Sequence, residues 1–169
     1  RVNRRFAEAA AGAVAEGGTV WVQDYQLQLV PKLLREIRPD VTIGYFHHIP
    51  FPPYGLYSQL PWRKQVLRGL LGADVIGFQR TADASNFAMA VRRQLQLETR
   101  ASGIQVPTAD GGTRFAVVQA FPIAIDTTSY AELVRRPEII ARAAEIREGL
   151  GNPRRIVLGV ARVDYTKGI

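Results

Sequence analysis

The stretch Val41-Thr-Ile-Gly-Tyr-Phe-His-His-Ile-Pro-Phe-Pro-Pro53 decides how the chain folds. Its first six residues are mostly apolar, which is typical of a strand buried on both faces of a parallel sheet. Two histidines and a proline-rich turn follow. Because proline fixes the backbone φ angle, we expect a rigid loop where the strand ends. The stretch therefore predicts an α/β fold with polar side chains at the carboxyl end of a strand.

Similar short apolar runs recur on either side of this stretch, with amphipathic segments between them. This alternation predicts a parallel sheet covered by helices on both faces. Strands are expected at residues 19–22, 41–46, 74–79, 114–121 and 155–160. Helices are expected at residues 26–37, 62–71, 81–97 and 130–150. Gly151 and Pro153 should end the last helix, because glycine accepts the left-handed cap and proline cannot continue the helix.

The pattern also predicts how the chain divides. It opens within an amphipathic helical segment and closes where a strand has ended and a helix should begin, so we expect a fragment of a longer protein. The first four predicted strands would form one doubly wound domain within residues 1–125. Residues 126–153 would be a helical connection, and residues 154–169 would open a second domain.

Composition narrows the class of protein. A chain of 169 residues with 47% hydrophobic content can bury a core. It has no apolar run long enough to cross a bilayer and no secretion signal, which favours a soluble cytoplasmic protein. The absence of cysteine excludes a disulfide framework, a thiolate nucleophile and a thiolate zinc site.

The formal net charge of +7 raises the question of nucleic-acid binding. The basic residues are scattered through helical segments where they also face acids, as Arg142 faces Glu145 and Glu148. This distribution argues against a nucleic-acid partner, and a phosphorylated small molecule fits better.

One candidate site follows the last predicted strand. Arg162 and Lys167 stand at the two ends of a short loop, and Gly168 would let the backbone approach a ligand. An arginine offers a planar donor fork and a lysine a mobile point charge, which suits a diphosphate. The alternative is that Arg162 pairs with Asp164 and Lys167 is merely solvated.

A second candidate site follows the first two strands. Asp24 comes directly after a buried strand, where it would accept a hydrogen bond from a sugar hydroxyl or, as local sequence favours, cap the following helix. His47 and His48 are adjacent, so their side chains should point to opposite sides and at most one should face a ligand. No carboxylate or further histidine stands at metal-ligand spacing, and the residues alone favour a structural histidine.

Six segments of the chain carry a family resemblance in the same order. They include Val-Trp-Val-Gln-Asp-Tyr at 20–25, His-Ile-Pro-Phe-Pro at 48–52 and Arg-Val-Asp-Tyr-Thr-Lys-Gly at 162–168, with further matches at 60–63, 67–78 and 120–123. Together they resemble the trehalose-6-phosphate synthase family over almost the whole chain. The motifs around His48 and between Arg162 and Gly168 are the most specific.

The resemblance implies a GT-B fold, in which two Rossmann-like, doubly wound parallel-sheet domains face each other across a cleft. This chain would hold the later part of the first, acceptor-side domain and the first strand of the second, which binds the nucleotide sugar. The implied reaction moves glucose from UDP-glucose to glucose 6-phosphate with retention, without metal or cofactor. The partners would be a nucleotide sugar and a sugar phosphate, with no nucleic acid or membrane, and a homo-oligomer stays open. The chain by itself should be inactive.

The resemblance also assigns roles to residues. The counterparts of Arg162 and Lys167 bind the diphosphate of the donor, and that of Asp24 contacts glucose 6-phosphate. The counterpart of His48 lies beside the donor sugar and completes a catalytic set with the two cations. The counterpart of Ile49 helps shape the pocket that selects the α anomer.

The chain departs from the family pattern at four single positions and in the turn at residues 54–57, where the family usually carries an acid. Gln23 and Gln26 stand where histidines are usual, His47 replaces an apolar residue, and Ala161 replaces an acid before the arginine. These departures leave open another nucleotide donor or another phosphorylated acceptor, such as glycerol 3-phosphate. Two further alternatives are a non-catalytic regulatory homologue and a pseudo-glycosyltransferase that couples cyclitols.

Overall fold

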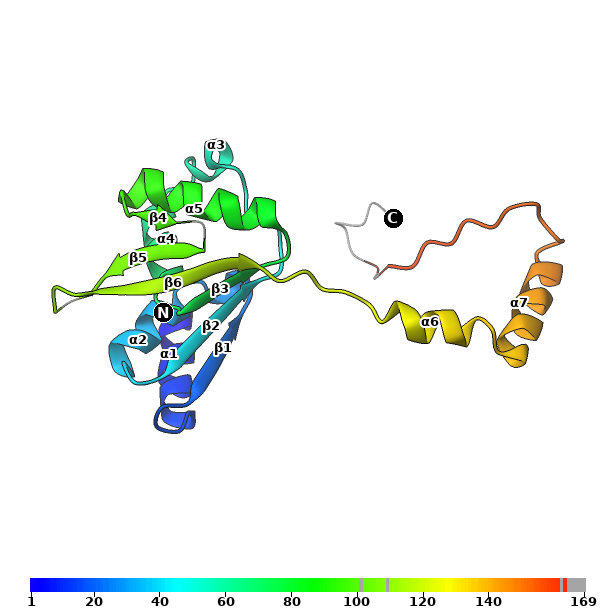
Figure 1. Ribbon diagram of the computed structural model, residues 1–169, viewed down its shortest axis with the longest axis horizontal. Helices are drawn as coiled ribbons and strands as arrows, with labels where there is room; N and C mark the ends of the chain where they lie inside the picture. Colours follow the sequence, from blue (N-terminus) through cyan, green and yellow to red (C-terminus); the bar gives the residue numbers. More distant parts are fainter. Residues whose placement is uncertain (101, 109, 162, 164–169) are drawn as a thin grey trace. The chain divides into compact units, whose positions relative to one another are not determined.

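The computed structural model describes residues 1–100, 102–108, 110–161 and 163. The chain divides into two compact units, Arg1–Ile123 and Ala124–Ile169. The first unit contains a sheet with its helices, and the second contains two helices, after which residues 151–161 form no helix or strand (Figure 1).

The first unit is built on a six-stranded sheet with the order β1-β2-β3-β6-β5-β4. Four strands run parallel, as the sequence predicts: β1 (Thr19–Gln23), β2 (Thr42–His47), β3 (Val75–Phe78) and β6 (Thr113–Ala120). The two outermost strands, β5 (Gly103–Pro107) and β4 (Thr99–Arg100), are antiparallel additions that the sequence does not predict.

Helices connect the parallel strands. These are α2 (Val30–Ile37), α3 (Tyr54–Tyr57), α4 (Arg63–Leu70) and α5 (Thr81–Leu95), whereas α1 (Val2–Ala13) precedes β1. The helix predicted at 26–37 begins instead with a short 3-10 turn, Tyr25–Leu27, and α2 follows it with Pro31 in its first turn. The first turn of a helix tolerates proline because its N–H groups have no partner within the helix.

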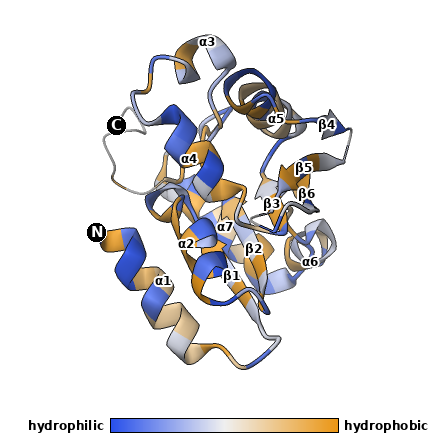
Figure 2. Cartoon of the chain, turned by 90° about the vertical axis from the view of Figure 1, so that its left-hand side faces the viewer, coloured by the Kyte–Doolittle hydropathy of each residue, from blue (hydrophilic) through white to orange (hydrophobic). Residues whose placement is uncertain are grey.

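These helices form one layer. Since β1, β2, β3 and β6 follow one another in a single direction across the sheet, right-handed crossovers place α2, α4 and α5 on the same face. α1 contacts α2, α2 contacts α4, and α4 contacts α5. Figure 2 shows α1, α2 and α4 on one side of β1, β2 and β3. The core lies between this layer and the sheet, with side chains such as Leu34, Ile43, Ile76 and Phe87 fully buried.

The opposite face of the sheet carries no helix within the described part of the first unit. The register places Trp21, Gly44, Val75 and Val117 on this face. Trp21 is 69% exposed there. The second helical layer of the predicted doubly wound domain therefore does not come from residues 1–100, 102–108 or 110–123.

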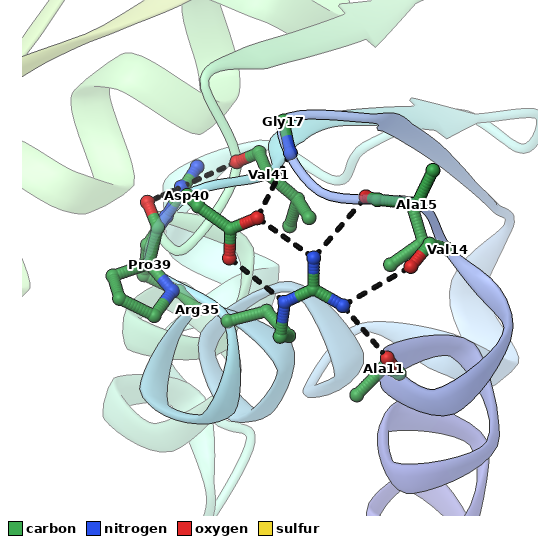
Figure 3. A network of polar contacts seen from close by, with 9 residues as sticks. Ala11, Val14, Ala15, Gly17, Arg35, Pro39, Asp40 and Val41 are labelled. Carbon is green, nitrogen blue, oxygen red and sulfur yellow. Dashed lines mark hydrogen bonds and ion pairs between the residues drawn. The ribbon is translucent and has the colours of Figure 1, made fainter.

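A polar network around Arg38 joins the end of α2 to the end of α1 (Figure 3). The Arg38 guanidinium makes two hydrogen bonds to the Asp40 carboxylate, at 2.7 and 2.8 Å. It also donates to the main-chain carbonyls of Ala11, Val14 and Ala15. Asp40 in turn accepts the Gly17 N–H at 3.0 Å. The bond to Ala11 satisfies a carbonyl that the last turn of α1 leaves without a partner, and the bonds to Val14 and Ala15 hold the segment that leads to β1.

The second unit contains α6 (Thr127–Leu133), capped by Asp126, and α7 (Pro137–Gly149). The single helix predicted at 130–150 is thus wrong, because Pro137 pushes Arg136 out of the helical region, to ψ 132°. The predicted stop after α7 is confirmed, with Gly151 at φ 78°.

Residues 155–160, where the sequence predicts a strand, form none in the structure. Val157 there is 96% exposed. A strand forms only against a neighbour that accepts and donates its main-chain hydrogen bonds, and the described residues of this unit provide no such neighbour.

Candidate functional site

Two polar segments meet at the carboxyl ends of β1 and β2. In the register of these strands Gln23 lies opposite Phe46. The N–H of Asp24 continues the ladder by donating to the Phe46 carbonyl at 2.8 Å. Since parallel strands end at the same edge of a sheet, Asp24 and His48 lie next to each other although they are far apart in the sequence.

Asp24 has an unusual backbone conformation, with φ 67° and ψ 172°. This region is almost restricted to glycine and costs another residue about 1–3 kcal/mol. One carboxylate oxygen, Oδ1, accepts the N–H groups of Tyr25 at 2.8 Å and His48 at 3.2 Å. Asp24 therefore caps the 3-10 turn, as local sequence favours, and also ties β1 to the loop after β2. Its other oxygen, Oδ2, makes no hydrogen bond among the described residues.

His48 is exposed and lies on the face of the sheet without helices. Its Nε2 is 2.7 Å from Oε1 of Gln23. Its ring lies 4.7 Å from the Phe46 ring, measured between centroids. Ile49, the next residue, is 43% exposed. The position predicted for the pocket that selects the anomer is therefore open to a ligand.

His47 points the other way, into the core, which confirms that the two histidines lie on opposite sides. It is 2% exposed, and its Nδ1 lies 2.9 Å from the Tyr45 hydroxyl. The rings of Phe51 and Phe78 surround it, each with its centroid 5.8 Å away. Burial lowers the pKa of His47, which keeps the ring neutral at neutral pH. His47 is thus a core residue with a satisfied hydrogen bond.

The proline-rich loop after His48 is held firmly, as the sequence predicts. The Phe51 side chain is buried, and its carbonyl accepts a hydrogen bond from the Asn86 amide on α5 at 3.0 Å. The Phe51 ring contacts those of Tyr57 and Phe87, with centroids 4.9 and 5.4 Å away. The loop that carries His48 and Ile49 therefore has a fixed backbone.

A groove of about 460 Å³ lies over the sheet face without helices and has Gln23 and His48 at its polar end. The remaining lining is almost entirely apolar: Trp21, Gly44, Tyr45, Phe46, Val75, Gly77, Phe121 and Ile123. Gly77 is required there, because a Cβ atom would lie 2.8 Å from the Phe46 ring and 3.0 Å from the Phe121 ring.

The structure thus brings together some of the predicted site residues. Asp24, His48 and Ile49 lie at one edge of the sheet. Arg162 and Lys167 lie outside the described residues, so their roles stay predictions. No three His, Cys, Asp or Glu side chains cluster as metal ligands in the described ranges, and metal independence also stays a prediction.

Two features of this region are not predicted from the sequence. One is the bond between Gln23 and His48, for which the only signal is that Gln23 departs from the family pattern. The other is Asp83, a carboxylate that is 3% exposed in the first turn of α5, with Arg80 Nε at 3.4 Å. An acid in the first turn of a helix is common, so nothing in the local sequence sets Asp83 apart.

The model of glycosyltransferase family 20 matches residues 1–169. Trehalose-6-phosphate synthase of Mycobacterium avium is 55% identical over 99% of this chain and 35% of its own length. That of Mycolicibacterium smegmatis is also 55% identical, over 99% of this chain and 34% of its own length. The chain therefore spans about a third of the length of the curated relatives it matches.

Solved structures of trehalose-phosphate synthases are also similar to this chain. A UDP-forming trehalose-phosphate synthase from Burkholderia xenovorans has a TM-score of 0.78 and 30% identity, over 99% of this chain and 36% of its own. An E. coli structure described as bound with UDP-2-fluoro glucose has a TM-score of 0.73 and 25% identity, over 90% of this chain and 33% of its own. A B. xenovorans complex with glucose-6-phosphate has a TM-score of 0.69 and 26% identity, over 87% and 33%.

Proposed function

Because the chain belongs to glycosyltransferase family 20, we propose that the whole protein is a retaining hexosyltransferase that moves glucose from UDP-glucose to glucose 6-phosphate and so makes trehalose 6-phosphate. The observation that carries this proposal is the 55% identity, over 99% of the chain, to a trehalose-6-phosphate synthase. The resemblance inferred from the motifs and the α/β GT-B fold that it implies are both confirmed.

The choice of substrates is supported by the solved neighbours. One is described with a fluorinated UDP-glucose and another with glucose 6-phosphate. Asp24 would contact the acceptor through Oδ2, the oxygen that has no hydrogen bond among the described residues. The strained backbone of Asp24 fits this role, because strain of this kind gathers at functional sites.

His48 and Ile49 would contact the donor sugar. Both side chains are open to a ligand, while the backbone beneath them is held by Asp24 and by the Phe51 carbonyl bond to α5. A site that must orient two sugars gains most from such fixed positions, since orientation lowers the barrier without any covalent step by the protein.

Arg162 and Lys167 would neutralise the departing diphosphate. When the bond between glucose C1 and the phosphate oxygen breaks, negative charge develops on UDP, and fixed cations stabilise it. Losing one such donor costs about 3 kcal/mol of barrier by analogy with oxyanion holes. The acceptor hydroxyl would approach on the face that UDP leaves, form the new bond to C1 and give its proton to the departing phosphate oxygen.

Two other functions keep the same fold. A non-catalytic regulatory homologue would bind sugars without turnover, and a pseudo-glycosyltransferase or related synthase would use a different phosphorylated acceptor. The departures at Gln23, Gln26, His47 and Ala161 motivate the second alternative. His47 is buried, so it carries no acceptor choice by direct contact.

The test is product analysis with the full-length protein. It is incubated with UDP-glucose, ADP-glucose or GDP-glucose and with glucose 6-phosphate, glycerol 3-phosphate or a phosphorylated cyclitol, each with and without EDTA. We expect trehalose 6-phosphate with an α,α linkage by NMR, and no loss of rate with EDTA. A product other than trehalose 6-phosphate, or no product from any pair, would refute the proposal.

The described residues include no helix long and apolar enough to span a bilayer. The cytoplasmic location stays a prediction. The inactivity of residues 1–169 alone also stays a prediction. It would be refuted if the purified chain of these residues turned over both substrates at the rate of the full-length protein.

A further inference from the structure

The side chain of Gln23 is the nearest polar partner of His48. Gln23 is the last residue of β1, and its register partner is Phe46 on β2. His48 lies two residues beyond Phe46, so all three side chains project from the same face of the sheet. The distance between Gln23 Oε1 and His48 Nε2 is 2.7 Å, which is a short, well-formed hydrogen bond.

We propose that Gln23 is a positioning residue that fixes the ring of His48 in the tautomer with its proton on Nε2 and thereby presents Nδ1 to a hydroxyl group of the donor sugar. The proposal rests on the proposed function and deepens it. An amide oxygen only accepts hydrogen bonds, so the facing Nε2 must carry the proton. In a neutral imidazole the other nitrogen, Nδ1, then has a free lone pair and accepts a hydrogen bond from a sugar hydroxyl.

The backbone of His48 is held separately from its ring. Asp24 Oδ1 accepts the His48 N–H at 3.2 Å, and the Asp24 N–H donates to the Phe46 carbonyl at 2.8 Å. Neither bond involves the Gln23 side chain. Removing that side chain should therefore leave the loop in place and release only the rotation and the tautomer of the ring.

The Phe46 ring limits the remaining freedom of His48. Its centroid lies 4.7 Å from that of His48, with 53° between the ring planes. This contact restricts where the imidazole lies but does not choose a tautomer, because the phenylalanine side chain has no nitrogen or oxygen atom that could donate or accept a hydrogen bond. The choice of tautomer therefore depends on Gln23. At metal sites, removing a residue that orients a ligand histidine typically lowers affinity or activity 10–100-fold. We expect the loss of the Gln23 side chain to lower kcat/KM about tenfold.

Kinetics of the full-length protein test the proposal. In Gln23→Leu, kcat/KM for UDP-glucose should fall about tenfold while KM for glucose 6-phosphate changes little. Gln23→His, which introduces the residue usual in the family, should restore most of the lost activity. Gln105→Leu is the matched control, because Gln105 lies on the same sheet face in the distant strand β5 and should leave kcat/KM unchanged.

The pH profile reports whether the side chain at position 23 acts on the His48 ring. A carboxylate in Gln23→Glu would stabilise protonated His48, so the acidic limb of kcat/KM should move to higher pH. A side chain at position 23 that does not reach the ring would leave that limb where it is. A Gln23→Leu enzyme with wild-type kcat/KM, or a Gln23→Glu enzyme with an unmoved acidic limb, would overturn the proposal.

NMR gives a readout that does not depend on turnover. In full-length protein labelled with ¹⁵N-histidine, long-range ¹H–¹⁵N spectra should show His48 as the Nε2-protonated tautomer, and Gln23→Leu should show a mixture. His48→Ala identifies the resonances. An Nδ1-protonated His48 in the wild type, or one unaltered by Gln23→Leu, would overturn the proposal. A wild type without turnover would count only against the proposed function, so the two failures are distinguishable.

Discussion

Replacing Asp24 by glycine and by alanine separates backbone strain from side-chain function. Both variants lose the carboxylate and hence the same hydrogen bonds to the N–H groups of Tyr25 and His48. In the folded state they differ in how well the new residue tolerates φ 67° and ψ 172°. Glycine adopts this conformation without steric cost, whereas the Cβ of alanine opposes it.

The size of the difference follows from two opposing terms. The strain is about 1–3 kcal/mol, and glycine relieves it. Glycine also gives the unfolded chain more freedom than alanine, which costs about 0.4–1 kcal/mol of stability. Asp24→Gly should therefore be more stable than Asp24→Ala by about 1–2 kcal/mol. At roughly 2–4 °C per kcal/mol for a domain of this size, its Tm should be about 2–8 °C higher.

Activity should not follow stability in this pair. Both variants lack the carboxylate proposed to contact glucose 6-phosphate, so both should lose kcat/KM for that acceptor by a similar factor. Asp24→Asn keeps an oxygen at Oδ1 and serves as the variant that retains the cap. Thermal unfolding and initial-rate kinetics are measured on the same full-length preparations.

Two results would contradict this reasoning. If Asp24→Ala is as stable as Asp24→Gly, the backbone at this position is not strained. If Asp24→Gly retains wild-type kcat/KM for glucose 6-phosphate, Asp24 does not contact the acceptor.

Three further predictions concern pH and the sheet face without helices. Burial lowers the pKa of His47, so the native state favours the neutral ring, and the stability that this gives above about pH 6.5 should be lost as the pH falls further. Between pH 7.5 and 5 the denaturant midpoint should change less in His47→Leu than in the wild type. The same change in both proteins would count against this prediction. The Arg38 hydrogen bonds lower the pKa of Asp40, so their stabilisation is fully present above about pH 4 and is lost progressively in more acid solution. The difference in stability between wild type and Asp40→Asn should therefore be largest at pH 7 and shrink between pH 4 and pH 2, and a constant difference would contradict this. Purified residues 1–169 should bind a hydrophobic dye at the exposed sheet face around Trp21, and the Trp21→Ser variant should bind less dye. Equal binding by the two proteins would contradict this prediction, because the dye would then bind away from Trp21.

The parallel part of the sheet is predictable from the sequence because each of its strands contains a short apolar run that contributes side chains to the core. The β4–β5 hairpin is not, because β4 has only two residues and β5 has only five, of which the first is Gly103 and the last Pro107. The break between α6 and α7 is indicated in the sequence by Pro137. The apolar pattern over residues 130–150 nevertheless predicts a single helix.

The site is predictable in position but not in detail. The carboxyl ends of strands point to Asp24 and His48, and the capping role of Asp24 follows from local sequence. The strained backbone of Asp24 depends on the Phe46 carbonyl and the His48 N–H, which belong to another strand. The bond from Gln23 to His48 likewise joins residues 25 positions apart, so no local pattern reveals it.

The central claim is that fixed cations, without a metal, stabilise the departing nucleotide. It is tested by initial rates of full-length Arg162→Ala in EDTA. Arg142→Ala is the control, because this exposed arginine on α7 pairs only with Glu145 among the described residues. We expect kcat/KM for UDP-glucose to fall roughly 100–1,000-fold in Arg162→Ala and to stay near wild type in the control. Unchanged donor turnover in Arg162→Ala would contradict it.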